Sequence, residues 1–556
     1  MEFQHKLPSM SCEDENGVRV HNGNYNNPEI SFPCMLTTED SKMGMFIKGL
    51  RDIILSNRRM ILVDGQTLVC NHNWIRDQNF IMEGFKHWEY DLHSYLDFII
   101  NHQHEKGFYY ELIKQMDDAH WSFVDEECYV KFPEDNVAMT RLELEADVEY
   151  DLILSVEKVY KVEGDLDYVA KVLPSTEKAI DYMTSDVKRW DPEHGLVKRP
   201  FTIDTWDFTN DESSQTDRRI YLDKMSIMHG DNSGVYAAMK VLSFFNRKLG
   251  NEEKAQQWDN RAETLKQNMI RWLWNGNFFI HQLHLNHPGV DNLENQRLSL
   301  SNGYDINRGV TTMEQSRKII EEYMRRRETT DTFAEWFTVD PPYAPAFMHY
   351  QPGQYVNGAI CPFAAGALAL AAFNNGYEEY GYDILCRLQQ IFDETGKIRF
   401  LYDRKDIHKG EDTSGPSAWG AGDILKAIDE GFAGLTDPEE QYHVLGFSPK
   451  FPVSNHRQIR YITGYEKCGV TIDVSYQRSD EGLLYQVTAP STEIRAHILL
   501  PKHCSVSSVL VNGQHQAVTY RDVYGSPYVD FVYRKSPDQR LKIEIYLQSE
   551  TASAEL

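Results

Sequence analysis

The sequence IDTWDFTNDE at residues 203–212 joins two segments with helical patterns, yet it is too aromatic and too acidic for an ordinary linker. An exposed connector is normally rich in Gly, Ser, Pro and Asn, whereas here Trp206 stands beside Asp207. An aromatic face next to a carboxyl group suits a site that stacks a sugar ring and transfers a proton. The structural alternative is that Asp207 caps the next helix while Trp206 fills a gap in the core.

Helical patterns occupy most of the chain on both sides of this stretch. Apolar residues recur there at helical spacing, with short breaks between segments. The expected helices span residues 43–55, 77–104, 141–163, 166–186, 233–249, 252–273, 314–327, 357–376, 377–394 and 417–432. Short strand-like pieces lie between them at 107–112, 121–132 and 278–284. The helices approach the twelve that six helical hairpins need, and strands do not alternate with helices as a parallel sheet or TIM barrel requires.

The pattern changes near LTDP at residues 435–438, after which alternating apolar and polar residues predict strands. The expected strands span 461–463, 470–476, 483–487, 494–500, 506–511, 517–520, 528–533 and 541–547. Turn signals such as Asn512-Gly513 separate them, which is typical of an antiparallel β-sandwich of about 100 residues. We therefore expect an irregular N-terminal arm at 1–40, a helical catalytic body at 41–436 and a β-sandwich at 437–556.

The composition is that of a globular protein and excludes several functions. The 556 residues, 41% of them hydrophobic and 25% charged, predict about two to four domains. A formal net charge of −27 argues against nucleic-acid binding, which needs a basic face. No apolar run reaches the roughly 18 residues of a membrane span, so no membrane partner is expected. Eight cysteines without a CxxC pair predict neither a disulfide framework nor a zinc site.

The N-terminal residues bear on localisation. Residues 1–14 lack the apolar core of a signal peptide, so a cytoplasmic location is expected. Secretion stays possible if a signal was trimmed from the sequence.

A second polar motif, WIRD at residues 74–77, lies where a loop enters a helix. The guanidinium of Arg76 and the carboxylate of Asp77 would hold sugar hydroxyls while Trp74 stacks on the ring. The alternative is an ion pair between Arg76 and Asp77 that fixes the start of the helix.

A third motif, FAEWF at residues 333–337, is followed by QPGQYVNGA at 351–359. An acid between aromatics, Glu335, ahead of a Gly-rich loop suits a carboxylate that activates water. The alternative for Glu335 is an ion pair with the Arg-rich run at 325–327. Farther along, Trp419 would wall the site or pack in the core, and Asp231 is a candidate helix cap.

The order of these motifs resembles that of the six-hairpin, (α/α)6-toroid glycosidases. WIRD is followed by WDF at 206–208, EWF at 335–337 and QYVNGA at 354–359, ahead of an apolar helix. That group includes glucoamylases, trehalases, glycogen-debranching glucosidase domains and α-rhamnosidases. The fold that the resemblance implies is mainly α, an (α/α)6 toroid of helical hairpins with a C-terminal antiparallel β-sandwich.

The resemblance also implies roles for single residues. Asp207 would be the general acid and Glu335 the general base, with Arg76 and Asp77 in the −1 subsite. Those families act mostly with inversion, which requires an acid and a base roughly 6.5–9.5 Å apart. Trehalases have a longer Gly-rich acidic signature than this chain, and glucoamylases have two successive Glu residues where Asp207-Phe208 stands here. Glu212 therefore stays the alternative acid.

The expected function is an exo-acting glycoside hydrolase for a short oligosaccharide or glycoside, without a metal or organic cofactor. The expected substrate-binding residues are Trp74, Arg76, Asp77, Trp206, Glu212, Trp336, Gln354, Asn357 and Trp419. One alternative is a sugar epimerase, phosphorylase or polysaccharide lyase on the same toroid, because a fold does not fix a reaction. The other is a carbohydrate-binding protein without catalysis. The sugar, the linkage and the oligomeric state stay open.

Overall fold

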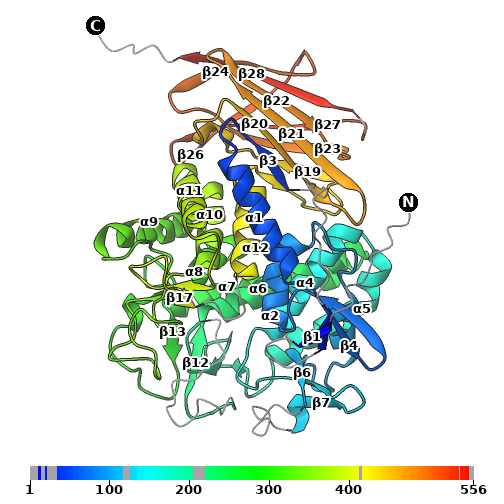
Figure 1. Ribbon diagram of the computed structural model, residues 1–556, viewed down its shortest axis with the longest axis vertical. Coiled ribbons are helices and arrows are strands. Elements are labelled where there is room, and N and C mark those ends of the chain that lie inside the picture. The colour runs from blue at the N-terminus through cyan, green and yellow to red at the C-terminus, as the bar shows by residue number, and fades with distance from the viewer. Residues whose placement is uncertain are drawn as a thin grey trace.

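The computed structural model describes residues 11–13, 19–21, 34–116, 126–204, 219–411, 416–537 and 539–549. A large helical part carries a layered region of strands at one end, and the C-terminal half of the chain supplies almost all of those strands (Figure 1). None of the helices in these ranges has the length and apolarity that crossing a membrane requires.

Twelve α-helices lie in the described ranges. They are α1 (Lys42–Ser56), α2 (Ile75–Phe85), α3 (Ser94–Asn101), α4 (Val148–Glu163), α5 (Leu166–Met183), α6 (His229–Lys248), α7 (Glu252–Leu273), α8 (Ser301–Arg308), α9 (Met313–Thr329), α10 (Pro362–Asn374), α11 (Glu378–Thr395) and α12 (Ala418–Lys426). A π-helical turn, Ala427–Phe432, continues α12.

The even-numbered helices contact one another in sequence order. The pairs are α2 with α4, α4 with α6, α6 with α8, α8 with α10, α10 with α12 and α12 with α2. This series returns to its starting helix. We call these six the inner helices and the odd-numbered six the outer helices, each of which contacts at least one inner helix.

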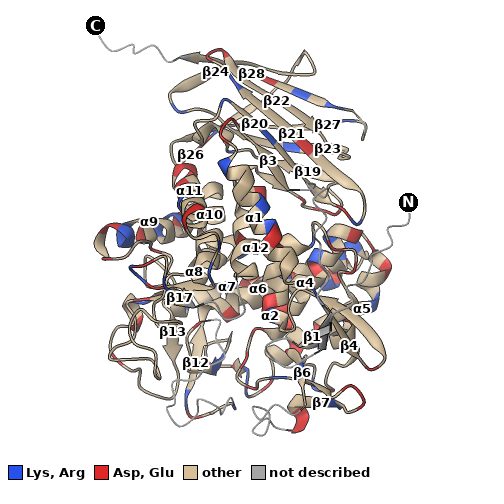
Figure 2. Cartoon of the chain, in the orientation of Figure 1, with Lys and Arg blue, Asp and Glu red and all other residues tan. Residues whose placement is uncertain are grey.

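Residue patterns explain which helices lie inside. Inner helix α10 (PFAAGALALAAFN) is apolar all round, and its residues from Pro362 to Phe373 are buried. Outer helix α7 buries a single stripe, formed by Ala255, Trp258, Ala262, Leu265, Met269 and Leu273. The charged residues of outer helices such as α1, α9 and α11 stand out in Figure 2.

The connections differ at the two ends of the inner helices. The segments that lead into their amino ends are long, at 57–74, 102–147, 184–228, 274–300, 330–361 and 396–417. The segments that leave their carboxyl ends are short, at 86–93, 164–165, 249–251, 309–312 and 375–377. Because long connections on a rigid scaffold carry function in many folds, the amino-end face is the candidate functional face.

Small sheets occupy the long connections and the N-terminal arm. Their strands are β1 (Ser11–Glu13), β2 (Arg19–His21), β4 (Arg59–Val63), β5 (Gln66–Cys70), β6 (Leu112–Gln115), β7 (Tyr129–Phe132), β8 (Val137–Thr140), β9 (Trp190–Asp191), β10 (Leu196–Val197), β11 (Arg199–Pro200), β12 (Met225–Met228), β13 (Gln282–His284), β14 (Leu298–Ser299), β15 (Val339–Asp340), β16 (Leu401–Tyr402) and β17 (Gly410–Glu411). They pair as β1-β2-β4-β5, β6-β8-β7, β11-β12-β13, β9-β10, β14-β15 and β16-β17.

The C-terminal strands form two packed sheets. They are β18 (Leu435–Thr436), β19 (Val444–Phe447), β20 (Gln458–Tyr465), β21 (Val470–Arg478), β22 (Gly482–Thr488), β23 (Glu493–Leu499), β24 (Cys504–Val511), β25 (Gln514–His515), β26 (Thr519–Val523), β27 (Ser526–Arg534) and β28 (Leu541–Ser549), joined by β3 (Met35–Thr37). The sheet orders are β18-β19-β23-β27-β26 and β25-β24-β28-β22-β21-β20-β3. Phe447 of the first sheet packs on Tyr485 of the second, with ring centroids 5.6 Å apart.

The structure corrects several element boundaries. The expected helix at 77–104 is two helices, α2 and α3, separated by residues 86–93. Helix α8, which the sequence patterns did not predict, is short and polar (SNGYDINR), and its two apolar residues, Tyr304 and Ile306, are too few for a recognisable helical repeat. Each of the eight expected C-terminal strands overlaps an observed strand.

Candidate active site

The candidate functional face brings together buried ionic side chains from segments far apart in the sequence. Arg76 lies in the first turn of α2, Asp147 immediately precedes α4, and Asp231 lies in the first turn of α6. The set consists of Arg76, Glu111, Glu145, Asp147, Arg199 and Asp231, which we call the arginine–carboxylate cluster. All six residues are buried.

Local hydrogen bonds bring the members of the cluster together. The backbone N–H of Ile75 donates to the carbonyl of Glu111 at 2.9 Å, which holds Glu111 beside the start of α2. The side chain of Asn232 bonds both to the N–H of Val197, at 2.8 Å, and to its carbonyl, at 2.9 Å. This fixes the strand segment that carries Arg199 against the first turn of α6.

Two arginines hold the four carboxylates together. Arg76 donates from Nε to Asp147 at 2.5 Å and from a second nitrogen to Glu145, and it lies 4.0 Å from Glu111. Arg199 contacts Glu145 and Asp231, each at 3.3 Å. Because four carboxyl groups share two guanidinium groups, positive charge does not balance all of them in the ionised form.

The electrostatic imbalance separates the carboxyl groups by pKa. Burial, followed by the charge of Glu145, raises the pKa of Glu111 well above its usual value. Burial also raises the pKa of Asp231 to about 6, against the opposing charge of Arg199. Burial opposes ionisation of Asp147 too, but the charge of Arg76 outweighs it and lowers the pKa of Asp147. The cluster thus favours the protonated form of Glu111 and Asp231 and the ionised form of Asp147.

Several oxygens of the cluster have free hydrogen-bonding capacity. Oε1 of Glu111, Oδ1 of Asp147 and Oδ2 of Asp231 are buried and have no hydrogen-bond partner among the described residues. Buried polar atoms are normally paired, so these oxygens are suited to accept hydroxyl groups of a ligand. Carboxylates and guanidinium groups are also the side chains that bind hydroxyls in bidentate fashion.

A second hydrogen-bonded chain lies at the same end of α6 and α8. His229 contacts Asp305 through Nδ1 at 2.5 Å and Ser299 through Nε2 at 2.6 Å. Ser299 donates to Oδ2 of Asp204 at 3.1 Å, and the N–H of Ser301 donates to the same oxygen at 3.3 Å. Burial opposes the charged form of His229, but the charge of Asp305 prevails and raises the pKa of the imidazole.

The described residues that flank the WDF motif are held by hydrogen bonds. The N–H of Asp204 donates to Nε2 of His281 at 3.1 Å, and the N–H of Ile220 donates to Glu143 at 3.2 Å. Trp206, Asp207 and Glu212 lie outside the described residues.

The third motif has a different environment. Glu335 is fully buried and accepts hydrogen bonds from Tyr380 at 2.5 Å and from Arg387 at 2.8 and 2.9 Å. Both partners belong to outer helix α11, so the carboxylate points away from the inner helices. The guanidinium of Arg387 also lies 4.6 Å from the ring centroid of the buried Trp336. The ion pair that Glu335 forms is therefore with Arg387, not with the Arg-rich run at 325–327.

The residues of the WIRD motif lie in different environments. Arg76 belongs to the cluster, and its partners are Asp147 and Glu145 in place of Asp77. Trp74 is half-buried against Leu112 and Leu142, at the start of α2. The Asp77 carboxylate is partly exposed and lies 3.8 Å from Nδ1 of His72.

The side chains of the remaining predicted residues stack on or hydrogen-bond to other residues of the protein. Trp419 stacks between Phe80 and Phe363, with ring centroids 4.4 and 4.3 Å away, so both of its faces are covered. Asn357 is fully buried and bonds to the backbone of Tyr343 in both directions, at 2.7 and 2.9 Å. Gln354 is exposed and accepts from the N–H of Gln351 at 3.1 Å.

Sequence reasoning missed most of the cluster. Glu111, Glu145, Asp147 and Arg199 were not candidates, and Asp231 was a candidate helix cap. One usable signal is LELEADVEYD at residues 142–151, which carries more acids before a helix than capping needs. No group of three or more His, Cys, Asp or Glu suited to a metal ion occurs within the described ranges.

A family model matches one part of the chain. The trehalase family model matches residues 202–335, the part of the chain that contains Asp204, Asp231 and Asp305. No curated protein sequence matches the chain.

Solved structures of rhamnosidases share the fold. An α-L-rhamnosidase from Dictyoglumus thermophilum aligns with a TM-score of 0.57 at 12% identity, over 92% of this chain and 50% of that one. A GH78 family rhamnosidase of Bacillus sp. GL1 aligns with a TM-score of 0.53 at 14% identity, over 80% of this chain and 40% of that one. The Streptomyces avermitilis α-L-rhamnosidase, complexed with L-rhamnose, aligns with a TM-score of 0.51 at 10% identity, over 92% and 42%.

These findings confirm the resemblance to the six-hairpin glycosidases that the sequence motifs indicated. At these identities the solved structures establish the fold alone. The chain spans only 40% to 50% of the length of these rhamnosidases.

Proposed function

We propose that the protein is an exo-acting glycoside hydrolase that cleaves a short oligosaccharide or glycoside with inversion. The observation that carries the proposal is the buried arginine–carboxylate cluster at the amino ends of the inner helices. Such a cluster offers charged donors and acceptors for sugar hydroxyls.

The architecture we propose is an (α/α)6 toroid at 41–436 followed by a β-sandwich at 437–556. The circuit of contacts from α2 through α12 and back to α2 supports it, because six inner helices that close on themselves form a ring. The alternation of inner and outer helices along the chain is that of six consecutive hairpins.

Asp207 is the proposed general acid. The proposal rests on the resemblance of WDF at 206–208 to the acid-bearing loop of the six-hairpin glycosidases. An aromatic neighbour such as Trp206 would raise the pKa of the carboxyl group and keep it protonated for donation to the leaving oxygen. Glu212 is the alternative acid on the same stretch.

Glu335 is the proposed general base, and its ion pair with Arg387 defines the competing structural role. A base must reach the attacking water, whereas the carboxylate of Glu335 now accepts three hydrogen bonds from α11. Catalysis by Glu335 therefore requires that this side chain leave Arg387.

The test is hydrolysis of a panel of aryl and natural α- and β-glycosides by the wild type and by Asp207→Asn. The anomer released is followed by NMR. We expect one glycoside to be cleaved with inversion, and the variant to lose a hundredfold or more in kcat, the size of a general-acid contribution of about 10²–10⁴. Glu212→Gln separates the two candidate acids, because the larger loss in kcat should fall on Asp207→Asn. Full activity in Asp207→Asn would remove it as the acid.

The two roles of Glu335 separate when activity and stability are measured together. If Glu335 is the base, Glu335→Gln loses activity while keeping its melting temperature, and Arg387→Gln stays active. If the ion pair is structural, both variants are destabilised to a similar degree, because each leaves a buried charge without its partner. The second result would transfer the base to another carboxylate.

A further inference from the structure

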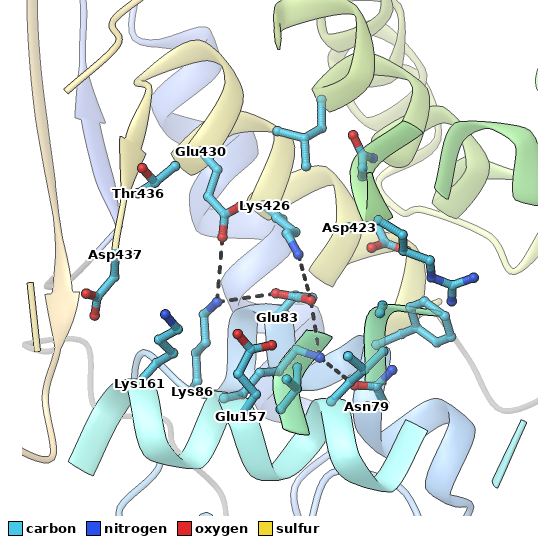
Figure 3. A pocket seen from close by; sticks show the side chains of 18 of the residues that line it. Asn79, Glu83, Lys86, Glu157, Lys161, Asp423, Lys426, Glu430, Thr436 and Asp437 are labelled. Atoms are coloured by element: carbon cyan, nitrogen blue, oxygen red, sulfur yellow. Dashed lines mark hydrogen bonds and ion pairs between the residues drawn. The ribbon is translucent and has the colours of Figure 1, made fainter. Parts of the chain in front are cut away.

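The inner helices also enclose a pocket toward their carboxyl ends, between the helices and the first C-terminal strands (Figure 3). Its volume is about 470 Å³, and all six inner helices contribute lining residues. Tyr442 and Tyr465, from the strand region, also line it. It is distinct from the arginine–carboxylate cluster, none of whose members line it, and its size is that of a small-molecule site.

Three lysines in this pocket converge on one carboxylate. The Nζ atoms of Lys426 and Lys158 lie 2.8 and 3.2 Å from Oε1 of Glu83, and that of Lys86 lies 3.2 Å from Oε2 (Figure 3). A second carboxylate, that of Glu430, lies 3.9 Å from Lys86. Glu83, Lys86 and Lys158 are all buried. Burial outweighs the attraction of Glu83 at Lys158 and lowers the pKa of its ammonium group.

Two further lysines line the pocket, and Lys240 pairs with Asp259. The side chain of Lys161 makes no hydrogen bond or ion pair within the described part of the chain, and its Nζ lies 4.9 Å from the ring centroid of Phe244. Two further carboxyl groups in the lining are already engaged. Asp423 accepts from Tyr304 at 2.5 Å and from Trp419 at 2.9 Å, and Asp437 accepts from the N–H of Tyr442 at 3.1 Å.

The charge balance predicts the ligand. The lining holds six cationic side chains, those of Lys86, Lys158, Lys161, Lys240, Lys426 and Arg308, and five carboxyl groups, those of Glu83, Glu157, Asp423, Glu430 and Asp437. The cations therefore outnumber the carboxyl groups by one, inside a chain with a net charge of −27. Excess buried charge is unfavourable unless a counter-charge is supplied. The remaining carboxylate, Glu157, lines the same pocket without a hydrogen-bond partner in the described residues, and it is suited to accept hydroxyl groups.

We propose that this pocket binds a small hydroxylated anion, a monosaccharide that carries a phosphate or a carboxylate. Lys86, Lys158 and Lys426 would hold the anionic group, Lys161 would complete its shell, and Glu157 would receive hydroxyls. The proposal does not depend on which residues catalyse hydrolysis at the opposite end of the inner helices.

The test is isothermal titration calorimetry, together with the melting temperature, on the full chain. The probes are glucose 6-phosphate, glucuronate, inorganic phosphate and uncharged glucose. We expect at least one sugar anion to bind and to raise the melting temperature, because a ligand that binds only the folded state stabilises it. Glucose should bind at least tenfold more weakly. The sugar anion that binds better identifies the anionic group.

Two variants place the binding in this pocket. Lys161→Met breaks no ion pair and should fold normally, yet it should weaken binding roughly tenfold, as the loss of a bond to a charged group does. Lys158→Met should abolish it. Lys171→Met, on the exposed surface of α5, is the matched control and should bind like the wild type. The proposal is overturned if no sugar anion binds at millimolar concentration, or if binding survives in both pocket variants.

Discussion

Asp231 is the residue at which burial and charge have a directly measurable consequence. Its pKa of about 6 in the folded protein exceeds the value of about 3.8 for an unshifted carboxyl group. The folded state therefore holds the proton more tightly, so this contribution to stability is complete below about pH 4 and is lost as the pH rises through about 6. The difference corresponds to at most about 3 kcal/mol.

Replacement of Asp231 by Asn should remove that pH dependence. We expect the free energy of unfolding of Asp231→Asn, relative to the wild type, to increase by up to about 3 kcal/mol between pH 4 and pH 8. Denaturant titration at both pH values measures it, with Asp181→Asn, at an exposed ion pair, as the control. An equal difference between wild type and Asp231→Asn at the two pH values would contradict the shifted pKa.

Arg76 is the one member of the arginine–carboxylate cluster that the sequence predicted as a substrate-binding residue, because it lies in a short, unusual motif. Arg76 stood out because Trp74 and Asp77 surround it, but its observed partners are Glu145 and Asp147, about seventy positions away. The cluster arises from tertiary convergence of helix starts, which no local pattern encodes. For Trp419 the sequence left two positions open, the wall of the site and the core. The structure stacks its ring between two phenylalanines.

Among the elements, the close contact between α10 and α12 depends on Gly366. A Cβ at this position would lie 2.6 Å from the backbone carbonyl carbon of Asp423, so the two inner helices would have to move apart. We expect Gly366→Ala to lower the free energy of unfolding by about 1–3 kcal/mol, as overpacking does. Gly420→Ala is the control, because its nearest neighbour, a side-chain methyl of Ile398, lies at 3.2 Å. Equal stability of the two variants would mean that the ring tolerates wider spacing.

Elements with strong periodicity were the predictable ones. The strand at 483–487 and the helix at 252–273 follow their patterns because one face of each is buried and the other is exposed. Helix α8 escaped prediction because most of its buried residues, including Ser301, Asn302 and Asp305, are polar. Asp305 bonds to His229 and Asn302 to the carbonyl of Phe279, so hydrogen bonds hold this helix where apolar contacts hold most others. A search for apolar residues at helical spacing does not detect such a helix.

At the scale of the whole molecule, the two mouths of the inner helices have opposite characters. The amino-end face carries the long connections and an excess of carboxylates. In the carboxyl-end pocket the cationic side chains outnumber the carboxyl groups by one, and residues of the strand region line it. Neither feature is visible in the net charge of −27, which averages over both. The attachment of the strand region to the helices therefore shapes the second pocket as well as the core.

That attachment includes a buried carboxylate with two donors. Glu378, in the first turn of α11, accepts from Ser526 at 2.6 Å and from Tyr528, both in strand β27. Its neighbour Glu379 is exposed and pairs with Lys502 at the surface, at 2.9 Å. Glu378→Ala would leave two donors buried without an acceptor, so we expect a loss of about 2–4 kcal/mol in the free energy of unfolding. Glu379→Ala should change it by less than about 0.5 kcal/mol.

Differential scanning calorimetry of the two variants reports how the parts are coupled. If the sandwich and the helices unfold together, Glu378→Ala lowers a single transition. If they unfold separately, the interface contributes little, and Glu378→Ala leaves the helical transition at the wild-type temperature. A shift in Glu379→Ala equal to that in Glu378→Ala would show that burial of the carboxylate is not the cause. The single lowered transition is the expected result, because the donors to Glu378 come from an interior strand of the five-stranded sheet, flanked by β23 and β26.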